Sequence, residues 1–218
     1  MKWASGSHAA RRYAVEVADF RTATSVGARI AAARKMRGFK STKELAAAIP
    51  GDSVTGSILQ NIEAGRKNDL AVAQLLNIAA ALKVSPLFIL APLGSPHERL
   101  DLPNISPAVA GMSVAEFDAW VSGLTDGSYR ALSADELSER TQLEAFRELL
   151  AARRELRRLE LRPRIEDGKE WQEASGNAND QAILDDTQYR IDETKRRISQ
   201  LEIYLGSAGW GVEQPATI

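Results

Sequence analysis

The chain has 218 residues, of which 44% are hydrophobic and 6% aromatic, and its formal net charge is -1. It contains no cysteine, which excludes a disulfide framework, a thiolate nucleophile and a zinc site built on sulfur. No stretch approaches the roughly 18 apolar residues that a membrane span needs, and the first residues lack the apolar core of a secretion signal. We therefore expect a cytoplasmic protein. Because alanine, leucine and arginine are plentiful and β-branched runs are few, we expect an all-α fold.

The small net charge conceals two parts of opposite sign. Up to Gly94 there are 13 lysines and arginines against 6 acidic residues, a balance of +7, whereas the remainder has 15 against 23, a balance of -8. A basic module joined to an acidic one is typical of a protein that holds phosphates with one end and keeps the other away from them.

Residues 1–23 show no sustained period and are predicted to form an N-terminal arm, whereas residues 24–93 have the pattern of a helical domain. Apolar residues that recur at three and four, capping residues and helix-ending glycines and prolines predict five short helices there. They cover residues 25–37, 43–49, 56–64, 69–83 and 86–90. Ser41 or Thr42 is expected to cap the second helix and Thr55 the third.

Three stretches of this domain, VGARIAAARKMRGFKSTKELAAAI, VTGSILQNIEAGR and LLNIAAALKVSPLFIL, resemble the Cro and lambda-repressor-like family, also called xenobiotic-response-element (XRE) regulators. The resemblance covers residues 25–93. It implies a five-helix domain whose second and third helices form a helix-turn-helix, with the third helix in the DNA major groove. The chain departs from the family in a turn about three residues longer at PGDS, in Thr42 where many members carry a phosphate-contacting glutamine, and in Gly56 where a long polar side chain is frequent.

The resemblance also assigns two groups of DNA-contacting residues. Those expected to read base edges are Thr55, Gly56, Ser57, Gln60 and Asn61. Those expected to contact phosphates are Lys40, Ser41, Thr42, Lys43, Arg66, Lys67 and Asn68. A partly buried ion pair between Arg34 and Glu63 is implied as well, and it would hold the third helix in place.

Side-chain chemistry agrees with these assignments. Small residues such as Gly56 and Ser57 permit close approach to a groove, and Asn61 can donate and accept at once to adenine. Arg66 or Lys67 can neutralise phosphates, on which affinity and its salt dependence rest. Three arginines of the arm are candidates for contact with the minor groove. They are Arg11, Arg12 and Arg21.

Beyond this domain, residues 94–110 are rich in proline and glycine and are predicted to be a linker. Residues 111–206 are predicted to form a second helical domain, followed by a tail over 207–218. Two capping boxes open helices in it. They pair Ser113 with Glu116 and Ser133 with Glu136.

Two long segments, about 133–162 and 179–205, are predicted to form a helical hairpin of coiled-coil type, with Pro163 ending the first. Their apolar positions alternate at four and three. These positions are Ala145, Leu149, Ala152, Leu156 and Leu159, then Leu184, Thr187, Ile191, Thr194, Ile198, Leu201 and Leu205. The seam can close on itself as an antiparallel pair or mate with a second chain, which would give a homodimer.

A run of arginines in the first of these segments suggests a second nucleic-acid patch. The run comprises Arg153, Arg154, Arg157, Arg158, Arg162 and Arg164. Because Glu148, Glu155 and Glu160 are interleaved with it, a solvated face laced with ion pairs is the preferred interpretation.

Catalytic and metal-binding patterns are missing from the sequence. His8 and His97 are the only histidines and lack metal-ligand spacing, and there is no Gly-rich phosphate loop. We therefore expect neither an enzyme nor a metal, cofactor or small-molecule site.

Taken together, the residues predict a sequence-specific double-stranded DNA-binding transcriptional repressor, of the phage immunity type, that acts by occupying its operator. One alternative is an antitoxin whose second half wraps a toxin. Another is a helical scaffold whose N-terminal fold no longer binds DNA. Co-purification of a small partner would favour the antitoxin, and indifference to charge reversal at Arg66 and Lys67 would favour the scaffold.

Overall fold

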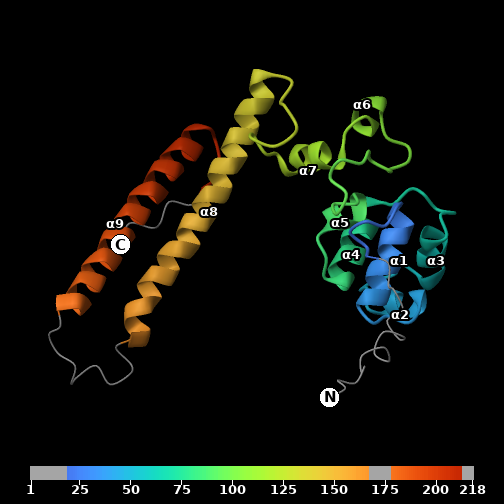
Figure 1. The fold of residues 1–218 in the computed structure, drawn as a ribbon, viewed down its shortest axis with the longest axis horizontal. Helices are drawn as coiled ribbons and strands as arrows, with labels where there is room; N and C mark the ends of the chain where they lie inside the picture. The colour runs from blue at the N-terminus through green and yellow to red at the C-terminus, as the bar shows by residue number, and fades with distance from the viewer. Residues whose placement is uncertain (1–18, 167–177, 213–218) are drawn as a thin grey trace, which may run out of the picture. The chain divides into compact units, whose positions relative to one another are not determined.

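The computed structural model describes residues 19–166 and 178–212 and divides into two compact units. Within these residues the first unit runs to Ser122 and includes 127–129, and the second comprises 123–126 and the chain from Arg130 onward. Both are built from helices (Figure 1), and the described residues contain no strand beyond one isolated antiparallel bridge between Arg99 and Ser113. This confirms the all-α expectation. None of the described helices combines the length and apolarity that crossing a membrane requires.

The first unit begins with five short helices, as the sequence pattern predicts. They are α1 (Val26–Met36), α2 (Thr42–Ala47), α3 (Gly56–Glu63), α4 (Val72–Leu82) and α5 (Pro86–Leu90). Predicted caps are present: the Ser41 hydroxyl accepts a hydrogen bond from Glu44 N at 3.2 Å, and the Thr55 hydroxyl accepts one from Ile58 N at 3.2 Å. Caps satisfy amide groups that a helix leaves unpaired in its first turn, so each short helix starts at a defined residue.

The core of this unit takes one to three fully buried side chains from each of these helices. Its members include Ile30, Ala33, Leu45, Leu59, Ile62, Ile78, Leu82 and Ile89. Helices of six to eight residues are marginal by themselves in water, so their stability comes from this shared packing.

Residues 94–110, predicted to be a linker, belong instead to the first unit. Leu100 packs with Val114 and Phe117 in a second small core that also draws on α5. Two further helices, α6 (Pro107–Ala110) and α7 (Val114–Ser122), follow. The segment packs on this unit because apolar side chains lie between its prolines and glycines, and burying them is favourable. Residues 111–122, predicted to open the second domain, are likewise part of the first unit.

A buried arginine ties this segment to α1. The Arg29 side chain has no exposed surface, and its two terminal nitrogens donate to the Asp101 carboxylate at 2.6 and 2.7 Å. Its Nε donates to the Ile89 carbonyl at 2.8 Å, and the terminal nitrogens also donate to the carbonyls of Ala23 and Leu90 at 3.0 and 3.1 Å. These five hydrogen bonds match the five N–H donors of a guanidinium, so the buried charge is both paired and satisfied.

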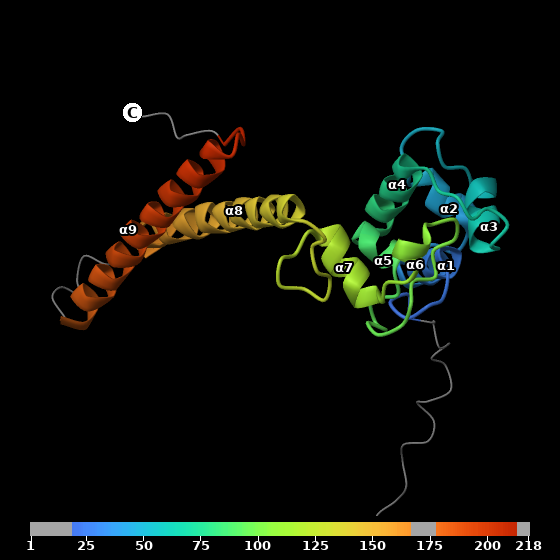
Figure 2. The ribbon, with the colours of Figure 1, turned by 90° about the horizontal axis from the view of Figure 1, so that it is seen from above.

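The second unit is dominated by the antiparallel pair α8 (Ala134–Glu166) and α9 (Ala178–Ser207), seen side by side in Figures 1 and 2. Its predicted seam closes within the chain, because Leu149, Ile198, Leu201 and Leu205 are buried together. The side chains of Leu184, Arg162 and Arg164 lie outside the described residues.

Two expectations for the second unit need correction. Helix α8 continues past Pro163, since a proline there removes only one amide donor close to the helix end. Trp210, placed in the predicted tail, packs its ring on Phe146 with centroids 5.3 Å apart and donates from Nε1 to Gln142 Oε1 at 2.8 Å.

We expect Asp101→Ala to lower the free energy of unfolding by about 3 kcal/mol, because it leaves the Arg29 guanidinium buried without its counter-ion. Urea unfolding of the full chain, followed by circular dichroism, measures this. Asp126→Ala, at an exposed aspartate, is the control and should change the free energy little.

The stability that Asp101 contributes should depend on pH. Burial disfavours the Asp101 carboxylate, but hydrogen bonds from Arg29 and from Ser25 N outweigh it and hold the Asp101 pKa below its ordinary value. The resulting stability is present above the unfolded pKa and disappears as pH falls through the lower folded value. The wild type should therefore lose stability below about pH 4 more steeply than Asp101→Ala, and parallel curves would contradict this assignment.

Candidate nucleic-acid interface

Helix α3 turns one face into the core and the other to solvent. Leu59 and Ile62 are 0% and 1% exposed, whereas Ser57, Gln60 and Asn61 are exposed. Figures 1 and 2 show α3 at the edge of the first unit. Three of the five residues predicted to read bases therefore form one polar face on a firmly seated helix.

Helix α3 lies very close to α1 at Gly27. A Cβ at this position would be 2.1 Å from the Ile62 carbonyl oxygen and 3.2 Å from Glu63 Cα, so no side chain fits. Because both contacts are with backbone atoms, the separation of the two helices does not depend on any rotamer. Sequence reasoning passed over Gly27, since a glycine inside a helix gives no signal of what lies against it.

An ion pair secures the C-terminal end of α3. Arg34 Nε donates to Glu63 Oε1 at 2.7 Å and Nη2 donates to Oε2 at 2.9 Å, while Nη1 donates to the Phe39 carbonyl at 2.9 Å. Hydrogen bonding to Glu63 raises the pKa of the Arg34 guanidinium. This is the pair that the family resemblance implies, and the two side chains are only 8% and 13% exposed.

The start of α3 packs on the start of α2. A Cβ at Gly56 would lie 3.0 Å from Lys43 Cγ and 3.3 Å from Lys43 Cα, and Gly56 is half-buried. Its lack of a side chain thus serves helix packing, which is a different role from the close approach to a groove that was predicted. The Thr55 and Ser57 hydroxyls lie 2.9 Å apart beside it, with Thr55 also acting as the cap of α3.

The residues predicted to contact phosphates differ in their surroundings. Lys40, Lys43, Arg66 and Asn68 are exposed, whereas Thr42 and Lys67 are half-buried. Ser41 is half-buried and caps α2, so its hydroxyl already accepts the Glu44 amide. Arg66 Nε donates to Asn61 Oδ1 at 3.0 Å, a contact that joins a predicted phosphate ligand to a predicted base reader.

The arm residues are mostly beyond what the structure describes. Arg11 and Arg12 lie outside the described residues. Arg21 is exposed and forms an ion pair with Asp19 at 2.6 Å, in which each partner shifts the pKa of the other toward the charged form.

The long turn between α2 and α3 is held by α4. Gln74 Nε2 donates to the Ser53 carbonyl at 2.8 Å, and Asn77 Nδ2 donates to Ser53 Oγ at 3.4 Å. These two amides were missed in the sequence, where they appeared only as polar positions of an amphipathic helix. They give the inserted residues a fixed anchor.

Moving the boundary to Ser122 changes the charge balance. Residues 1–122 hold 14 lysines and arginines against 10 acidic residues, a balance of +4, and residues 123–218 hold 14 against 19, a balance of -5. Two of the cations, Arg29 and Arg34, are paired in the interior. Their charges are therefore balanced inside the unit and contribute little to the charge of its surface.

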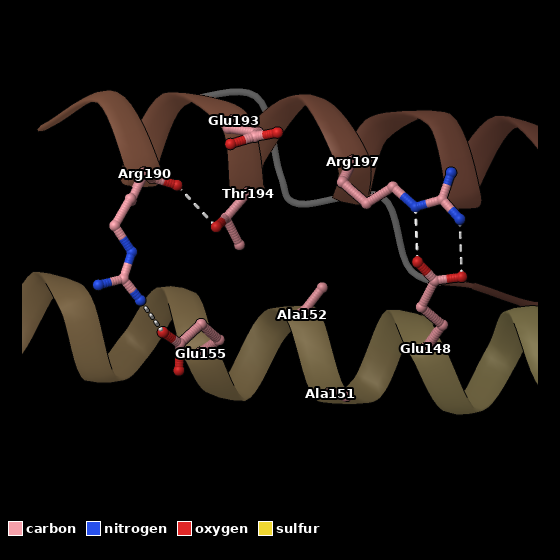
Figure 3. Close-up of a pocket in the computed structure, with 8 residues that line it drawn as sticks. All are labelled: Glu148, Ala151, Ala152, Glu155, Arg190, Glu193, Thr194 and Arg197. Carbon is pink, nitrogen blue, oxygen red and sulfur yellow. Dashed lines mark hydrogen bonds and ion pairs between the residues drawn. The ribbon is translucent and has the colours of Figure 1, made fainter. Parts of the chain in front are cut away.

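Two arginines of the run in α8 form ion pairs with acidic side chains. Arg158 pairs with Glu155 at 2.8 Å and Arg153 with Glu202 at 2.8 Å. Figure 3 shows the shallow groove between α8 and α9, where Arg197 makes two hydrogen bonds to Glu148 at 2.6 and 2.7 Å and thereby lowers the Glu148 pKa. This pattern agrees with an ion-paired helix surface.

Comparison of the chain with protein-family models, with curated proteins and with solved structures finds no significant match. The candidate interface therefore depends on the geometry of its own residues.

We expect Gly27→Ala to lower the free energy of unfolding by at least about 2 kcal/mol, since the new methyl group meets the Ile62 carbonyl and neither backbone can yield locally. Gly56→Ala is the matched comparison, because its closest contact is the flexible Lys43 side chain. It should change the free energy by less than about 1 kcal/mol. Urea unfolding of both variants measures the difference, and equal losses would show that α1 and α3 are not in backbone contact.

Proposed function

We propose that this chain is a sequence-specific double-stranded DNA-binding protein that represses transcription by occupying its operator. The first unit provides the DNA surface, with α2 and α3 acting as a helix-turn-helix. No cofactor is part of the mechanism, and repression is steric. The finer assignment, a repressor of the phage immunity type, rests on the resemblance of residues 25–93 to the Cro and lambda-repressor-like family.

One observation supports this function above the others: the exposed polar face of α3 lies on a helix held by buried side chains, a backbone contact with α1 and an ion pair. The DNA major groove is about 12 Å wide and admits one helix, whose N-terminal side chains reach base edges. Ser57, Gln60 and Asn61 are exposed on such a helix, and Leu59 and Ile62 bind it to the core. Specific recognition needs this rigidity, because a mobile helix cannot align hydrogen bonds with base edges.

The contact between Arg66 and Asn61 supports separate roles for the two residues, with Asn61 reading a base and Arg66 binding a phosphate. A carboxamide that reads adenine accepts from the base N6 amino group and donates to N7. Its Oδ1 has two lone pairs, so Arg66 Nε can hold the amide in orientation while one lone pair remains for the base. The other N–H groups of the Arg66 guanidinium then remain to bind a phosphate of the DNA backbone.

Selection of bound duplexes from a random pool by the full-length protein, at near-physiological salt, tests the proposal directly. We expect an enriched motif. Asn61→Ala should weaken binding to that motif by about 1–3 kcal/mol, or roughly 5-fold to 150-fold, and relax preference at one base pair. Gln200→Ala, at an exposed amide of α9, is the control and should bind as the wild type does. The absence of any enriched motif would refute sequence-specific binding.

Charge reversal separates phosphate contacts from base reading. The double variant Arg66→Glu, Lys67→Glu should lose affinity for all duplexes alike, and the slope of log affinity against log salt should fall in magnitude by about 2. Titration of a fluorescent duplex at several salt concentrations measures both quantities. Arg154→Glu with Arg157→Glu is the matched control, since these are exposed arginines of α8. A loss confined to the α8 double variant would instead assign the phosphates to the arginine run, and no loss in either would contradict the proposed DNA binding.

A further inference from the structure

The loop between α3 and α4 carries three of the residues predicted to contact phosphates. Its first part is tied to α3, because the backbone amides of Arg66 and Lys67 donate to the Asn61 carbonyl at 2.9 and 3.1 Å. Further along, Asp69 Oδ1 accepts a hydrogen bond from Asn104 Nδ2 at 2.8 Å. The loop is therefore fastened to α3 at its start and to a distant segment of the chain near its end.

The segment that carries Asn104 is itself fixed in place. Three residues earlier, Asp101 binds the buried guanidinium of Arg29. Leu102 packs against both cores of the first unit, and Ile105 packs against the smaller one. Because its neighbours on both sides are anchored, the side-chain amide of Asn104 starts from a defined position.

The backbone at Asn104 limits which side chains suit this place. Its φ is 60°, in the left-handed region that glycine, asparagine and aspartate adopt most readily. Glycine has no side chain to donate, and the carboxylate of an aspartate would repel Asp69. Asparagine meets both requirements, because it tolerates this backbone and its amide nitrogen is a donor.

The bond also decides which partner the Asp69 carboxylate has beside two cations. Asp69 is two residues from Lys67 and three from Arg66, and a carboxylate so near in the chain can pair with either cation or repel a phosphate. In the part of the chain that the structure describes, Asp69 forms no ion pair and binds the neutral amide of Asn104. The charges of Arg66 and Lys67 are therefore not neutralised by Asp69.

We propose that Asn104 is a positioning residue for DNA binding. It holds the loop between α3 and α4 and keeps the Asp69 carboxylate on a neutral partner, so that Arg66 and Lys67 remain available to phosphates. The hold on the loop follows from contacts within the first unit, whereas its consequence for phosphates rests on the proposed function. Affinity for DNA then depends on the packing of 94–110, a segment beyond the five helices.

Interchanging the two side chains tests the hold without DNA. Asn104→Asp sets two carboxylates against each other, so amide hydrogen exchange in peptides covering 66–71 of the full-length protein should be about fivefold faster. The double variant Asn104→Asp, Asp69→Asn restores one amide opposite one carboxylate and the wild-type net charge, so its protection should return to the wild-type value. Ser106→Asp is the control. It adds the same charge two residues along, at a side chain that caps no amide, and should leave this exchange unchanged.

A second variant removes the donor without adding charge. Asn104→Gly suits the left-handed backbone and should speed exchange in the same peptides, whether or not Asn104→Asp folds. Circular dichroism of each variant checks folding. Wild-type protection in both Asn104 variants would overturn the hold on the loop, as would a double variant that stays as fast as Asn104→Asp, or equally fast exchange in Ser106→Asp.

A DNA titration then separates this inference from the proposed function. With a fluorescent duplex of mixed sequence, Asn104→Asp should bind about fivefold more weakly than Ser106→Asp, which has the same net charge. The double variant should bind as the wild type does. Equal binding by Asn104→Asp and Ser106→Asp would overturn the role of Asn104 in DNA binding. If the wild type binds no duplex, the proposed function fails, and the exchange result still decides whether Asn104 holds the loop.

Discussion

The first unit depends on one guanidinium that has no contact with water. The Arg29 side chain is fully buried. It donates hydrogen bonds to Asp101 and to the carbonyls of Ala23, Ile89 and Leu90. A charge in that position is tolerated only because each donor finds an acceptor. The arginine thereby connects the chain before α1, the end of α5 and the segment beyond it. These contacts join the five helices to the residues that follow them within one compact unit.

The same helix that carries Arg29 also positions α3. Gly27 lies two residues before it and receives the backbone of Ile62, and Arg34 lies five residues after it and binds Glu63. Along α1, the contacts therefore run from the backbone approach at Gly27, through the buried Arg29, to the ion pair of Arg34. The polar face of α3 inherits its orientation from this series, and the proposed reading of DNA bases requires such an orientation before any ligand arrives.

Much of this architecture follows from local sequence rules. The features that these rules do not predict can each be explained. The five short helices, the caps at Ser41 and Thr55 and the seam of α8 with α9 could be predicted because periodicity and capping are properties of neighbouring residues. The role of Arg29 could not, since a charged residue within an amphipathic pattern is normally assigned to solvent. The segment 94–110 was predicted to be a linker from its proline and glycine content. That content does not indicate whether the intervening leucines are buried.

Some features of the candidate site could likewise be predicted from the sequence, and others could not. The polar character of Ser57, Gln60 and Asn61 is visible in the sequence, whereas the bond between Arg66 and Asn61 and the anchoring of the long turn by Gln74 depend on distances that no spacing rule supplies. Gly56 was assigned to the DNA surface for its small size. Small size also suits close helix packing, and the structure uses it there.

The contact at Gly27 has a consequence for how this protein can diverge. Because α1 meets α3 through backbone atoms, the pose of α3 is independent of the side chains on its outer face. Ser57, Gln60 and Asn61 are thus free to vary without disturbing the fold. If the proposed function holds, single substitutions on this face would change the target preference with little effect on how α3 is seated.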